Sequence, residues 1–391
     1  MTYPDIIIAH RHERRLLNGH LWAFSNELKE IRKDIPAGSL VRLVREKDAT
    51  PFALAFYNPH SLIAARIISR NPEDTINTDF LKERIMQSAN RRAELLKRRN
   101  AVRLIHGESD FLPGLIVEKY GDILTFQITS AGMELLKPQI IEVLVEVFSP
   151  RAIIEKNKSH LRKLEGLEEI ETIVYGTDTD TIIHDENGIQ FAVSLLKGQK
   201  TGFYLDQMEN HTTFARYVKQ GDNILDLFSN VGGFALNTAR AGANVTAVDA
   251  SVEALASLSA NAELNNVNEK ITTIEADCFD FIKSDNKVYD AIIVDPPSLL
   301  RSKKELQTAK KGYFNLNRNA MKLVKPEGIL LTASCSHHFT RELFLETIRD
   351  AANGANRQVS ILEERGAGID HPILAMMPET EYLKLFVLRV S

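Results

Sequence analysis

The spacing of apolar residues changes character twice along the chain. Residues 1–70 carry short β-branched and aromatic runs separated by turns, which predict a small β-rich barrel. Apolar residues at helical spacing across 79–99 predict one helix whose opposite face is basic. Further strand-like runs and a helix near 131–148 follow, so residues 73–190 are predicted to form a second, α+β unit.

From residue 221 onward, strand-like and helical segments alternate. The run NILDLF precedes the small-residue helix GGFALNTARAG, NVTAVD precedes SVEALASLSANAELN, and YDAIIVD precedes a long helical stretch over 303–324. This alternation is typical of a doubly wound, mainly parallel sheet with helices on both faces. The fold class expected for the C-terminal part is therefore α/β.

The composition is that of a globular protein of two or three domains, with 391 residues, 44% hydrophobic and 26% charged. No apolar run approaches the ~18 residues that a membrane span requires, and the N-terminus lacks the order of a secretory signal. Two cysteines, Cys278 and Cys335, give neither a disulfide framework nor metal-ligand spacing. We therefore expect a cytoplasmic protein with no membrane partner and no metal.

Charge is unevenly distributed along the chain, although the net charge is only -4. Residues 1–99 hold 18 Lys and Arg against 12 Asp and Glu, which gives this part a net charge of +6 and leaves -10 for the remainder. A basic N-terminal part favours an anionic partner such as nucleic acid. The alternative is a solvated helix face, which charge alone does not exclude.

Three acids follow three successive predicted strands of the C-terminal part. Asp226 precedes the glycine turn SNVGGF, Asp249 ends the next strand, and Asp277 follows the third. The turn lacks the three spaced glycines of a dinucleotide fingerprint, and an acid before it suits a cationic ligand better than a pyrophosphate. The ammonium and sulfonium of S-adenosylmethionine fit, with Asp249 on the ribose and Asp277 near the adenine. The alternative for each acid is a helix N-cap.

Five ordered motifs, DLFSNVGGF, VDAS, ADCF, VDPPS and TASCS, resemble those of class I methyltransferases. With GHLWAF, GESDFLPGLIVEKYGD and GQKTGFYLDQ, they resemble more narrowly the bacterial large-subunit ribosomal RNA cytosine-5 methyltransferases that carry an N-terminal PUA domain. The resemblance covers nearly the whole chain. It implies a PUA-like domain over 1–72, a central α+β domain over 73–190, and over 191–391 a Rossmann-like class I domain with a seven-stranded mixed sheet. A homodimer is common in that family.

The resemblance and the strand-end positions together assign the cofactor residues. They lie in the first four of these motifs and in the segment that leads into the catalytic domain. For that segment the alternative is a packed domain junction. The set is Asp226, Phe228, Ser229, Asn230, Gly232, Gly233, Phe234, Asp249, Ala250, Ser251, Asp277, Cys278, Asp295, Pro296, Tyr204, Asp206 and Gln207.

Cys335 is the predicted nucleophile. Because C5 of cytosine is a poor nucleophile, a thiolate must first add to C6, and cysteine both attacks and leaves readily. Asp295, which follows the fourth strand, could bond N3 and the exocyclic amine of the base and act as general acid. The alternative for Cys335 is a small buried thiol, which is how we interpret Cys278. We interpret the adjacent His337 and His338 as a loop feature.

The residue after Pro297 distinguishes this chain from several classes of methyltransferase. Some RNA cytosine-5 methyltransferases carry a releasing cysteine in this motif, whereas amino-group methyltransferases carry an aromatic residue that stacks on the base. This chain has Ser298 there, which weighs against amino-group methylation. Three further functions compete with this hypothesis: methylation of a different substrate, RNA binding by an assembly factor with a relic cofactor pocket, and nicotinamide-dependent dehydrogenation.

The expected substrate is large-subunit ribosomal RNA. A base inside a helix must be flipped out before a thiol can reach it, so RNA-holding surface outside the catalytic domain is needed. The PUA-like domain and the basic helix would supply this surface through phosphate contacts. The residues predicted to contact RNA are Lys200, Pro297, Arg91, Arg92, Arg98 and Arg99.

Overall fold

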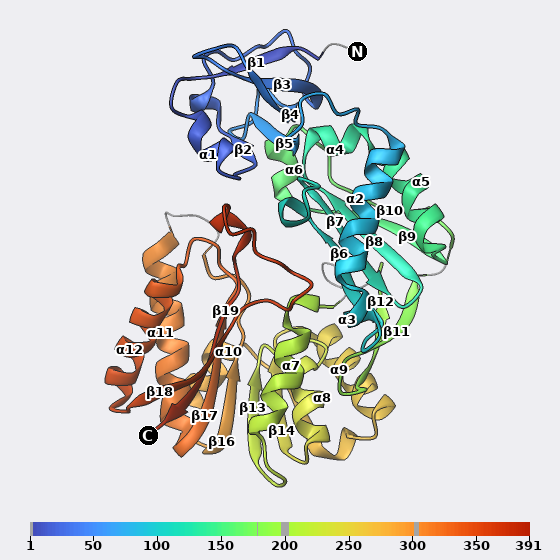
Figure 1. Ribbon diagram of the computed structural model, residues 1–391. Coiled ribbons are helices and arrows are strands. Elements are labelled where there is room, and N and C mark those ends of the chain that lie inside the picture. Colours follow the sequence, from blue (N-terminus) through green and yellow to red (C-terminus); the bar gives the residue numbers. More distant parts are fainter. Residues whose placement is uncertain (1–2, 178, 197–202, 301–304) are drawn as a thin grey trace. The chain divides into compact units, whose positions relative to one another are not determined.

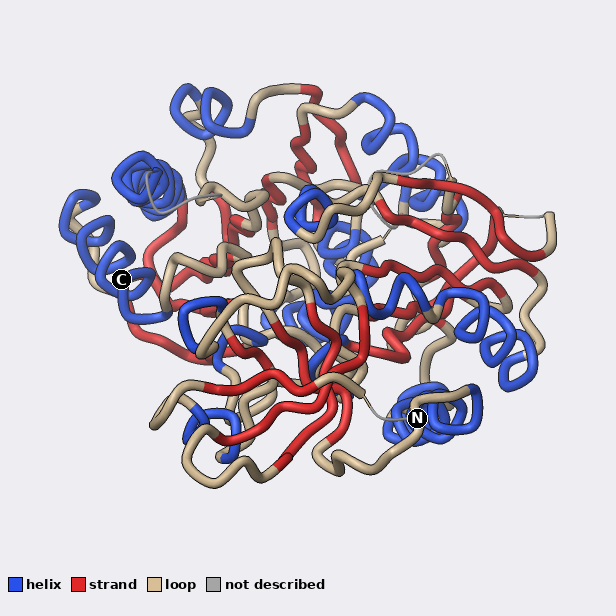
Figure 2. Tube along the Cα trace, turned by 90° about the horizontal axis from the view of Figure 1, so that it is seen from above, coloured by secondary structure: helices blue, strands red, loops and turns tan. Residues whose placement is uncertain are grey.

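The computed structural model describes residues 3–177, 179–196, 203–300 and 305–391 (Figure 1). The chain forms two compact units. Unit 1 comprises Met1–Thr181, Val193–Phe203 and Asp370–Thr380, and unit 2 comprises Ile182–Ala192, Tyr204–Ile369 and Glu381–Ser391. In Figure 2 the strands of the sheets run side by side in red, with helices in blue beside them. The three domain boundaries expected from the sequence remain predictions.

The first sheet of unit 1 has five strands in the order β1-β3-β4-β5-β2. Strand β1 is parallel to β3, and the other pairs are antiparallel. The β-rich N-terminal region expected from the sequence is thus present. Its elements are β1 (Asp5–Ile8), α1 (Glu13–Leu17), β2 (Trp22–Ala23), β3 (Ser39–Arg45), β4 (Pro51–Tyr57) and β5 (Ala65–Ser69).

The second sheet of unit 1 has the order β10-β9-β8-β7-β6, with only β8 and β9 parallel. Its strands are β6 (Ala101–His106), β7 (Leu115–Tyr120), β8 (Ile123–Ile128), β9 (Ala152–Asn157) and β10 (Ile170–Tyr175). The helices of this part are α2 (Thr78–Arg91), α3 (Ala93–Leu96), α4 (Ala131–Leu135), α5 (Lys137–Phe148) and α6 (His160–Leu164). Helices α2 and α5 pack against each other.

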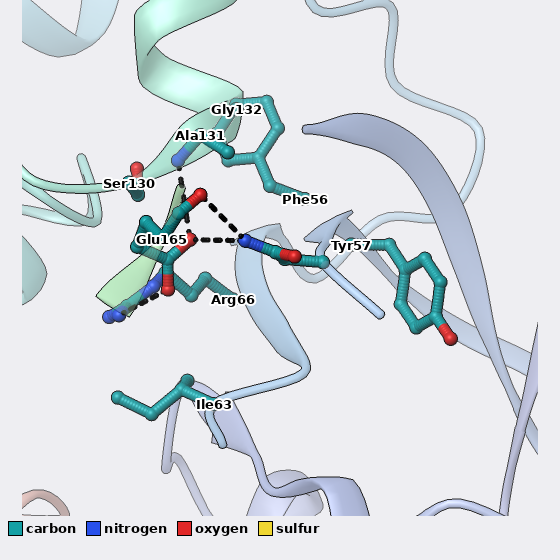
Figure 3. A pocket seen from close by; sticks show the side chains of 9 residues that line it. Phe56, Tyr57, Ile63, Arg66, Ser130, Ala131, Gly132 and Glu165 are labelled. Atoms are coloured by element: carbon teal, nitrogen blue, oxygen red, sulfur yellow. Dashed lines mark hydrogen bonds and ion pairs between the residues drawn. The ribbon is translucent and has the colours of Figure 1, made fainter. Parts of the chain in front are cut away.

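One of the hydrophobic clusters of unit 1 contains residues of both sheets. Leu54 and Phe56 of β4 belong to the same buried cluster as Leu104 of β6 and Phe126 of β8. Phe56 lies against Gly132 of α4, where an added Cβ would come within 2.0 Å of the phenyl ring (Figure 3). The glycine is therefore required for this close approach of helix and sheet.

A buried carboxylate, that of Glu165, completes this junction. It accepts hydrogen bonds from Asn58 at 3.1 Å, from Ser61 at 2.8 Å and from the backbone N–H of Ala131 at 3.3 Å. It also pairs with Arg66 at 3.2 Å (Figure 3). Because both oxygens of the carboxylate are occupied by protein donors, we interpret the small pocket there as structural.

The prediction of a single helix over 79–99 is wrong for the second half of that range. Helix α2 ends at Arg91 and a short helix α3 follows, in which Leu95 is the buried residue. The helix expected near 131–148 is likewise divided, at Leu136 between α4 and α5. Pro138 lies in the first turn of α5, a position that proline tolerates because its missing N–H would have no helical partner.

Arg92 and Arg99 correct the prediction of an outward-facing basic surface. Their side chains are 3% and 0% exposed, so neither lies on the surface that RNA would touch. Arg92 bonds Asp110 with two nitrogens at 2.7 Å, and Arg99 pairs with Asp370 at 3.0 Å. Burial alone would raise the pKa of Asp370, but His371 and Arg99 hold it far below its usual value. These arginines therefore anchor the segment 370–380 within unit 1.

Unit 2 contains a seven-stranded sheet in the order β15-β14-β13-β16-β17-β19-β18. The first five strands in this order, from β15 to β17, are parallel to their neighbours. Strand β19 is antiparallel to both β17 and β18. This confirms the predicted α/β class with a seven-stranded mixed sheet. The strands are β13 (Asn223–Leu227), β14 (Asn244–Asp249), β15 (Ile271–Glu275), β16 (Tyr289–Val294), β17 (Val324–Ser334), β18 (Val359–Arg365) and β19 (Lys384–Val390).

Helices cover both faces of this sheet. One face packs against α10 (Cys278–Ser284), α11 (Leu306–Leu323) and α12 (Arg341–Ala355), which share a buried cluster with the strands. Helices α7 (Met208–Phe214), α8 (Gly233–Arg240) and α9 (Val252–Leu264) belong to the other layer (Figure 1). A separate two-stranded sheet joins β11 (Asp180–His184) to β12 (Gln190–Ser194). Within the described ranges, no helix is long and apolar enough to cross a membrane.

Replacing Arg99 by Met should destabilise unit 1. The substitution leaves the buried Asp370 carboxylate without its arginine, and breaking a buried pair in this way costs about 3–5 kcal/mol. Urea unfolding followed by the fluorescence of Trp22, the chain's one tryptophan, measures the change. The matched control is Arg98→Met at an exposed position, which should change the free energy of unfolding by less than about 0.5 kcal/mol. Equal stabilities of the two variants would contradict the anchoring role.

Candidate active site

The turn after β13 is held in a strained conformation. Phe228 and Asn230 have φ values of 61° and 47°, in the left-handed region, and Gly232 follows with φ 95°. For residues other than glycine this conformation costs roughly 1–2 kcal/mol each, and such strain gathers at functional sites. Helix α8 then begins at Gly233, where a Cβ would lie 2.2 Å from the imidazole of His211. The glycine thus allows His211 to pack directly on the start of the helix.

Asp226 lies in the interior at the end of β13. It is 1% exposed, and burial, followed by the charge of Asp295, raises its pKa well above the usual value. A hydrogen bond from the backbone of Ala235 acts in the opposite direction. Its Oδ2 and the nearby Oγ of Ser229 are buried and have no hydrogen-bond partner among the described residues. Two buried oxygens without donors fit a ligand that supplies donors, such as the amino group of adenosylmethionine.

Asp249 ties the turn to the end of β14. Its Oδ2 accepts a hydrogen bond from the N–H of Asn230 and its Oδ1 one from the N–H of Ser251, both at 2.9 Å. A carboxylate has about four lone-pair sites, so these two bonds leave acceptor capacity for ribose hydroxyls. Ala250 and Ser251 follow directly, and Ser251 caps helix α9.

Asp277 adopts the alternative arrangement considered for it, that of a helix N-cap. Its Oδ1 accepts from the N–H groups of Phe279 and Asp280 at 2.8 and 3.1 Å. The side chain of Cys278 is buried, bonds the N–H of Phe228 at 3.3 Å, and has its pKa raised to about 12, mainly by burial. The structural interpretation of this thiol therefore holds, and any contact with the cofactor would come from its backbone.

Asp295 follows β16 and meets a residue from the segment before α7. Gln207 is buried and its Nε2 donates to Asp295 Oδ2 at 2.8 Å. Asp206 instead accepts from the hydroxyl of Tyr382 at 2.6 Å, and Tyr204 is exposed. Sequence motifs placed Tyr204, Asp206 and Gln207 in one group, whereas the structure gives each different surroundings. Lys200 lies outside the described residues.

Cys335 follows β17 in a loop held by its two neighbouring serines. Ser334 Oγ donates to the hydroxyl of Tyr313 at 2.9 Å, and Ser336 Oγ lies 3.2 Å from the same hydroxyl. Ser336 Oγ also lies 3.0 Å from Ser298 Oγ, in the Pro-Pro-Ser turn after β16. The loops that carry Asp295 and Cys335 are therefore joined side chain to side chain. Cys335 itself is partly exposed, in contrast to Cys278.

A lysine that the motif analysis did not select lies beside the thiol. Lys384, at the start of β19, is 7% exposed and donates to the carbonyl oxygens of Ser336 and Tyr382 at 2.7 and 2.8 Å. Burial lowers its pKa to about 8, while the negative charge of Cys335 acts in the opposite direction. A lysine within the apolar run YLKLFVLRV was the available sequence signal.

The histidines after Cys335 are both exposed. The ring of His337 lies 5.4 Å from that of Tyr382. Pro296 is buried and Pro297 is exposed after Asp295. Phe234 is buried on α8, with its ring 4.5 Å from that of His211. Among the described residues no cluster of metal-ligating side chains is present.

Comparison with known proteins agrees with this geometry. The family profile for a PUA-like domain matches residues 6–70, and that for the TRM5/TYW2 methyltransferase domain matches residues 182–326. The chain is 38% identical to ribosomal RNA large subunit methyltransferase I of Shewanella frigidimarina, over 97% of both chains. It is 35% identical to the protein of that name from Klebsiella pneumoniae, over 99% of this chain and 98% of the other.

The chain belongs to the ribosomal RNA large subunit methyltransferase I family. The predicted resemblance to the PUA-containing, adenosylmethionine-dependent large-subunit methyltransferases is thereby confirmed. A crystal structure of a methyltransferase complexed with SAH shares the fold, with a TM-score of 0.86, 21% identity, and coverage of 99% of this chain and 100% of that one. The sequence similarity to the family members covers both units of the chain.

Replacing Lys384 by Met should slow alkylation of Cys335. The ammonium beside the thiol stabilises the thiolate, so its removal should lower the iodoacetamide reaction rate at pH 7 by about tenfold. In the parent chain this assistance should fade as the pH rises through about 8, where Lys384 loses its proton. Peptide mass spectrometry after timed alkylation measures the rate.

Cys278 is the internal control for this experiment. Because it is buried with a pKa of about 12, it should remain unmodified in both proteins, and its modification would reveal unfolding. If the parent and Lys384→Met alkylate Cys335 at the same rate at every pH, while Cys278 stays protected, then Lys384 does not activate the thiol.

Proposed function

We propose that this chain methylates C5 of a cytosine in large-subunit ribosomal RNA, using adenosylmethionine, through a covalent bond between Cys335 and C6. The observation that carries the proposal is the joined pair of loops after β16 and β17. Val294 and Thr332 are register partners on these parallel strands, and Asp295 and Cys335 follow them on the same sheet edge. The Ser298–Ser336 contact holds the two loops together.

The described residues fit the cofactor at the adjoining strand ends. Among the described residues, Asp226 Oδ2 and Ser229 Oγ are buried without a donor, and Asp249 retains acceptor capacity toward a ribose. Bound there, adenosylmethionine would supply an electrophilic methyl group. The strained turn at Phe228 and Asn230 is the backbone that would approach it.

Cys335 and Asp295 act on different atoms of the base. The Cys335 thiolate, favoured by Lys384, adds to C6 and makes C5 nucleophilic. Asp295 bonds the N3 and amine edge of the base and balances the charge that the addition places on N3. Positioning then accounts for most of the remaining acceleration, because the loops fix thiol and carboxyl on neighbouring strands.

The environment of Ser298 disfavours amino-group methylation. That chemistry uses an aromatic residue after the two prolines to stack on the base. Here the Ser298 hydroxyl instead bonds Ser336 and the carbonyl of Leu300, at 3.0 and 3.2 Å. This side chain links two loops and supplies no stacking surface.

RNA would be held partly through unit 1. The family profile at residues 6–70 is that of a PUA-like domain, and Arg91 and Arg98 remain exposed near it in the sequence. Arg91 bonds Asp110 at 3.0 Å but keeps a half-exposed side chain. Phosphate contacts by such side chains add affinity without reading sequence.

Replacing Cys335 by Ala should abolish 5-methylcytidine formation while cofactor binding remains. The parent and the variant each receive labelled adenosylmethionine and large-subunit RNA that lacks its own modifications, followed by nucleoside analysis. Cys278→Ala is the matched control and should form product, because its thiol is structural. Normal methylation by Cys335→Ala, or an N-methylated nucleoside from the parent, would overturn the proposal.

Replacing Arg98 by Gln should weaken RNA binding without changing the product. One lost phosphate contact should reduce the slope of log affinity against log salt by about 0.7–0.9. Filter binding at several salt concentrations measures this slope. An unchanged slope would remove Arg98 from the proposed RNA surface.

A further inference from the structure

Asp295 stands at the inner end of a continuous chain of hydrogen bonds. Gln207 Nε2 donates to Asp295 Oδ2 at 2.8 Å, and Asn210 Nδ2 donates to Gln207 Oε1 at 2.7 Å. Arg365 Nε donates to Asn210 Oδ1 at 2.6 Å. Arg365 is in turn held by Glu363 at 2.7 Å. All these residues belong to unit 2.

The direction of this chain follows from its outer end. A guanidinium can only donate, so the oxygen of Asn210 must face Arg365. The Asn210 amide nitrogen then faces two acceptors, Gln207 Oε1 and the carbonyl of Gly366 at 3.0 Å. The Gln207 oxygen is thereby occupied, and its nitrogen must point to Asp295.

Burial makes this direction hard to reverse. Gln207 is 4% exposed and Asn210 is 1% exposed. If either amide turned over, it would set acceptor against acceptor or donor against donor at a place that water does not reach. Buried polar groups left in that state are strongly disfavoured. Arg365 therefore sets the hydrogen-bonding polarity of a carboxyl three links away.

We propose that Gln207, oriented by Asn210 and Arg365, positions Asp295 so that the site accepts cytosine and rejects uracil. The inference rests on the proposed function, because it assigns the base edge to Asp295. Gln207 keeps Oδ2 an acceptor, which suits the amino group of cytosine and opposes the O4 oxygen of uracil. Any proton that Asp295 exchanges with N3 must then move through Oδ1.

The proton balance of the reaction is consistent with this assignment. As the Cys335 sulfur bonds C6, the C5=C6 electron pair shifts through C4 to N3, which takes the proton from Oδ1. The C4=C5 pair of the resulting enamine would then bond the methyl carbon as that carbon's bond to the donor sulfonium breaks, and the donor sulfur would leave as a neutral thioether. A water molecule then takes the C5 proton, and the C–H pair re-forms C5=C6. The sulfur–C6 bond breaks, the sulfur leaves as thiolate, and the N3 proton returns to Oδ1.

Replacing Asn210 by Asp tests the polarity directly. The new carboxylate would still accept from Arg365, but it would offer Gln207 only an acceptor, so the Gln207 amide should turn over. Asp295 would then face the Gln207 oxygen, and its one proton would be held on Oδ2 by that oxygen. Oδ1 could then no longer protonate cytosine N3, so the preference for cytosine over uracil should be lost. RNA containing 5-fluorocytidine or 5-fluorouridine at the target position traps the covalent adduct, and the ratio of the two trapping rates measures base preference.

We expect the parent to trap 5-fluorocytidine RNA preferentially, and N210D to lower that ratio by about a hundredfold. Gln207→Met, which is nearly isosteric, should lower the cytosine rate at saturating adenosylmethionine by about tenfold or more. Arg365→Met should lower the preference for cytosine, whereas Arg365→Lys, which retains a donor-only cation, should keep most of it. Arg341→Met, on the exposed ion pair with Glu364, is the matched control.

Two failures can be told apart. If the parent neither forms an adduct nor makes 5-methylcytidine, the proposed function is wrong, whatever the variants do. If the parent forms the adduct but N210D and Gln207→Met keep its base preference and rate, only the positioning role is wrong. Adenosylmethionine binding by each variant verifies that it is folded, and Gln207→Met decides the question if N210D fails to fold.

Discussion

The parallel register of β13, β16 and β17 is the constraint on which the candidate site depends. These strands are neighbours, so their carboxyl ends open onto one edge of the sheet and deliver Asp226, Asp295 and Cys335 there. A slip of one residue would turn every side chain to the other face of the sheet. The apolar cluster shared with α10, α11 and α12 fixes the register, so the hydrophobic core also determines where the chemistry lies.

Hydrogen bonds between side chains then fix the loops that follow β16 and β17. Ser336 joins the loop after β17 to the loop after β16 and to Tyr313 of α11, and Lys384 holds the carbonyl of the same serine from β19. One serine hydroxyl and one carbonyl thus receive bonds from three different elements. Because Tyr313, Ser334 and Ser336 are fully buried, these bonds are worth more than they would be in water. Cys335 is thus flanked by two fixed serines and stays partly exposed itself.

The sequence predicted the parts of the site that depend on local patterns. The acids Asp226, Asp249 and Asp295, the glycine turn and Cys335 all lie where strand-to-helix spacing placed them. It did not predict that Arg92 and Arg99 are buried, because their partners include Asp370, which lies more than two hundred residues away. A basic stripe has the same helical periodicity whether it faces water or a buried acid. Lys384 was missed for the converse reason, since its carbonyl partners carry no sequence signal.

The C-terminal segment shows why local patterns could not place these residues. The chain leaves unit 2 at Ile369, contributes Asp370–Thr380 to unit 1, and returns to unit 2 at Glu381. Asp370 is buried against Arg99, and fourteen residues later Lys384 is buried near Cys335. A domain excised at residue 191 would lose both the arginines that bind Asp370 and the surroundings that bury it, so the segment 370–380 would lose its anchor. The same C-terminal stretch continues into β19 and delivers Lys384, so the surroundings of Cys335 depend on a segment that is anchored in unit 1.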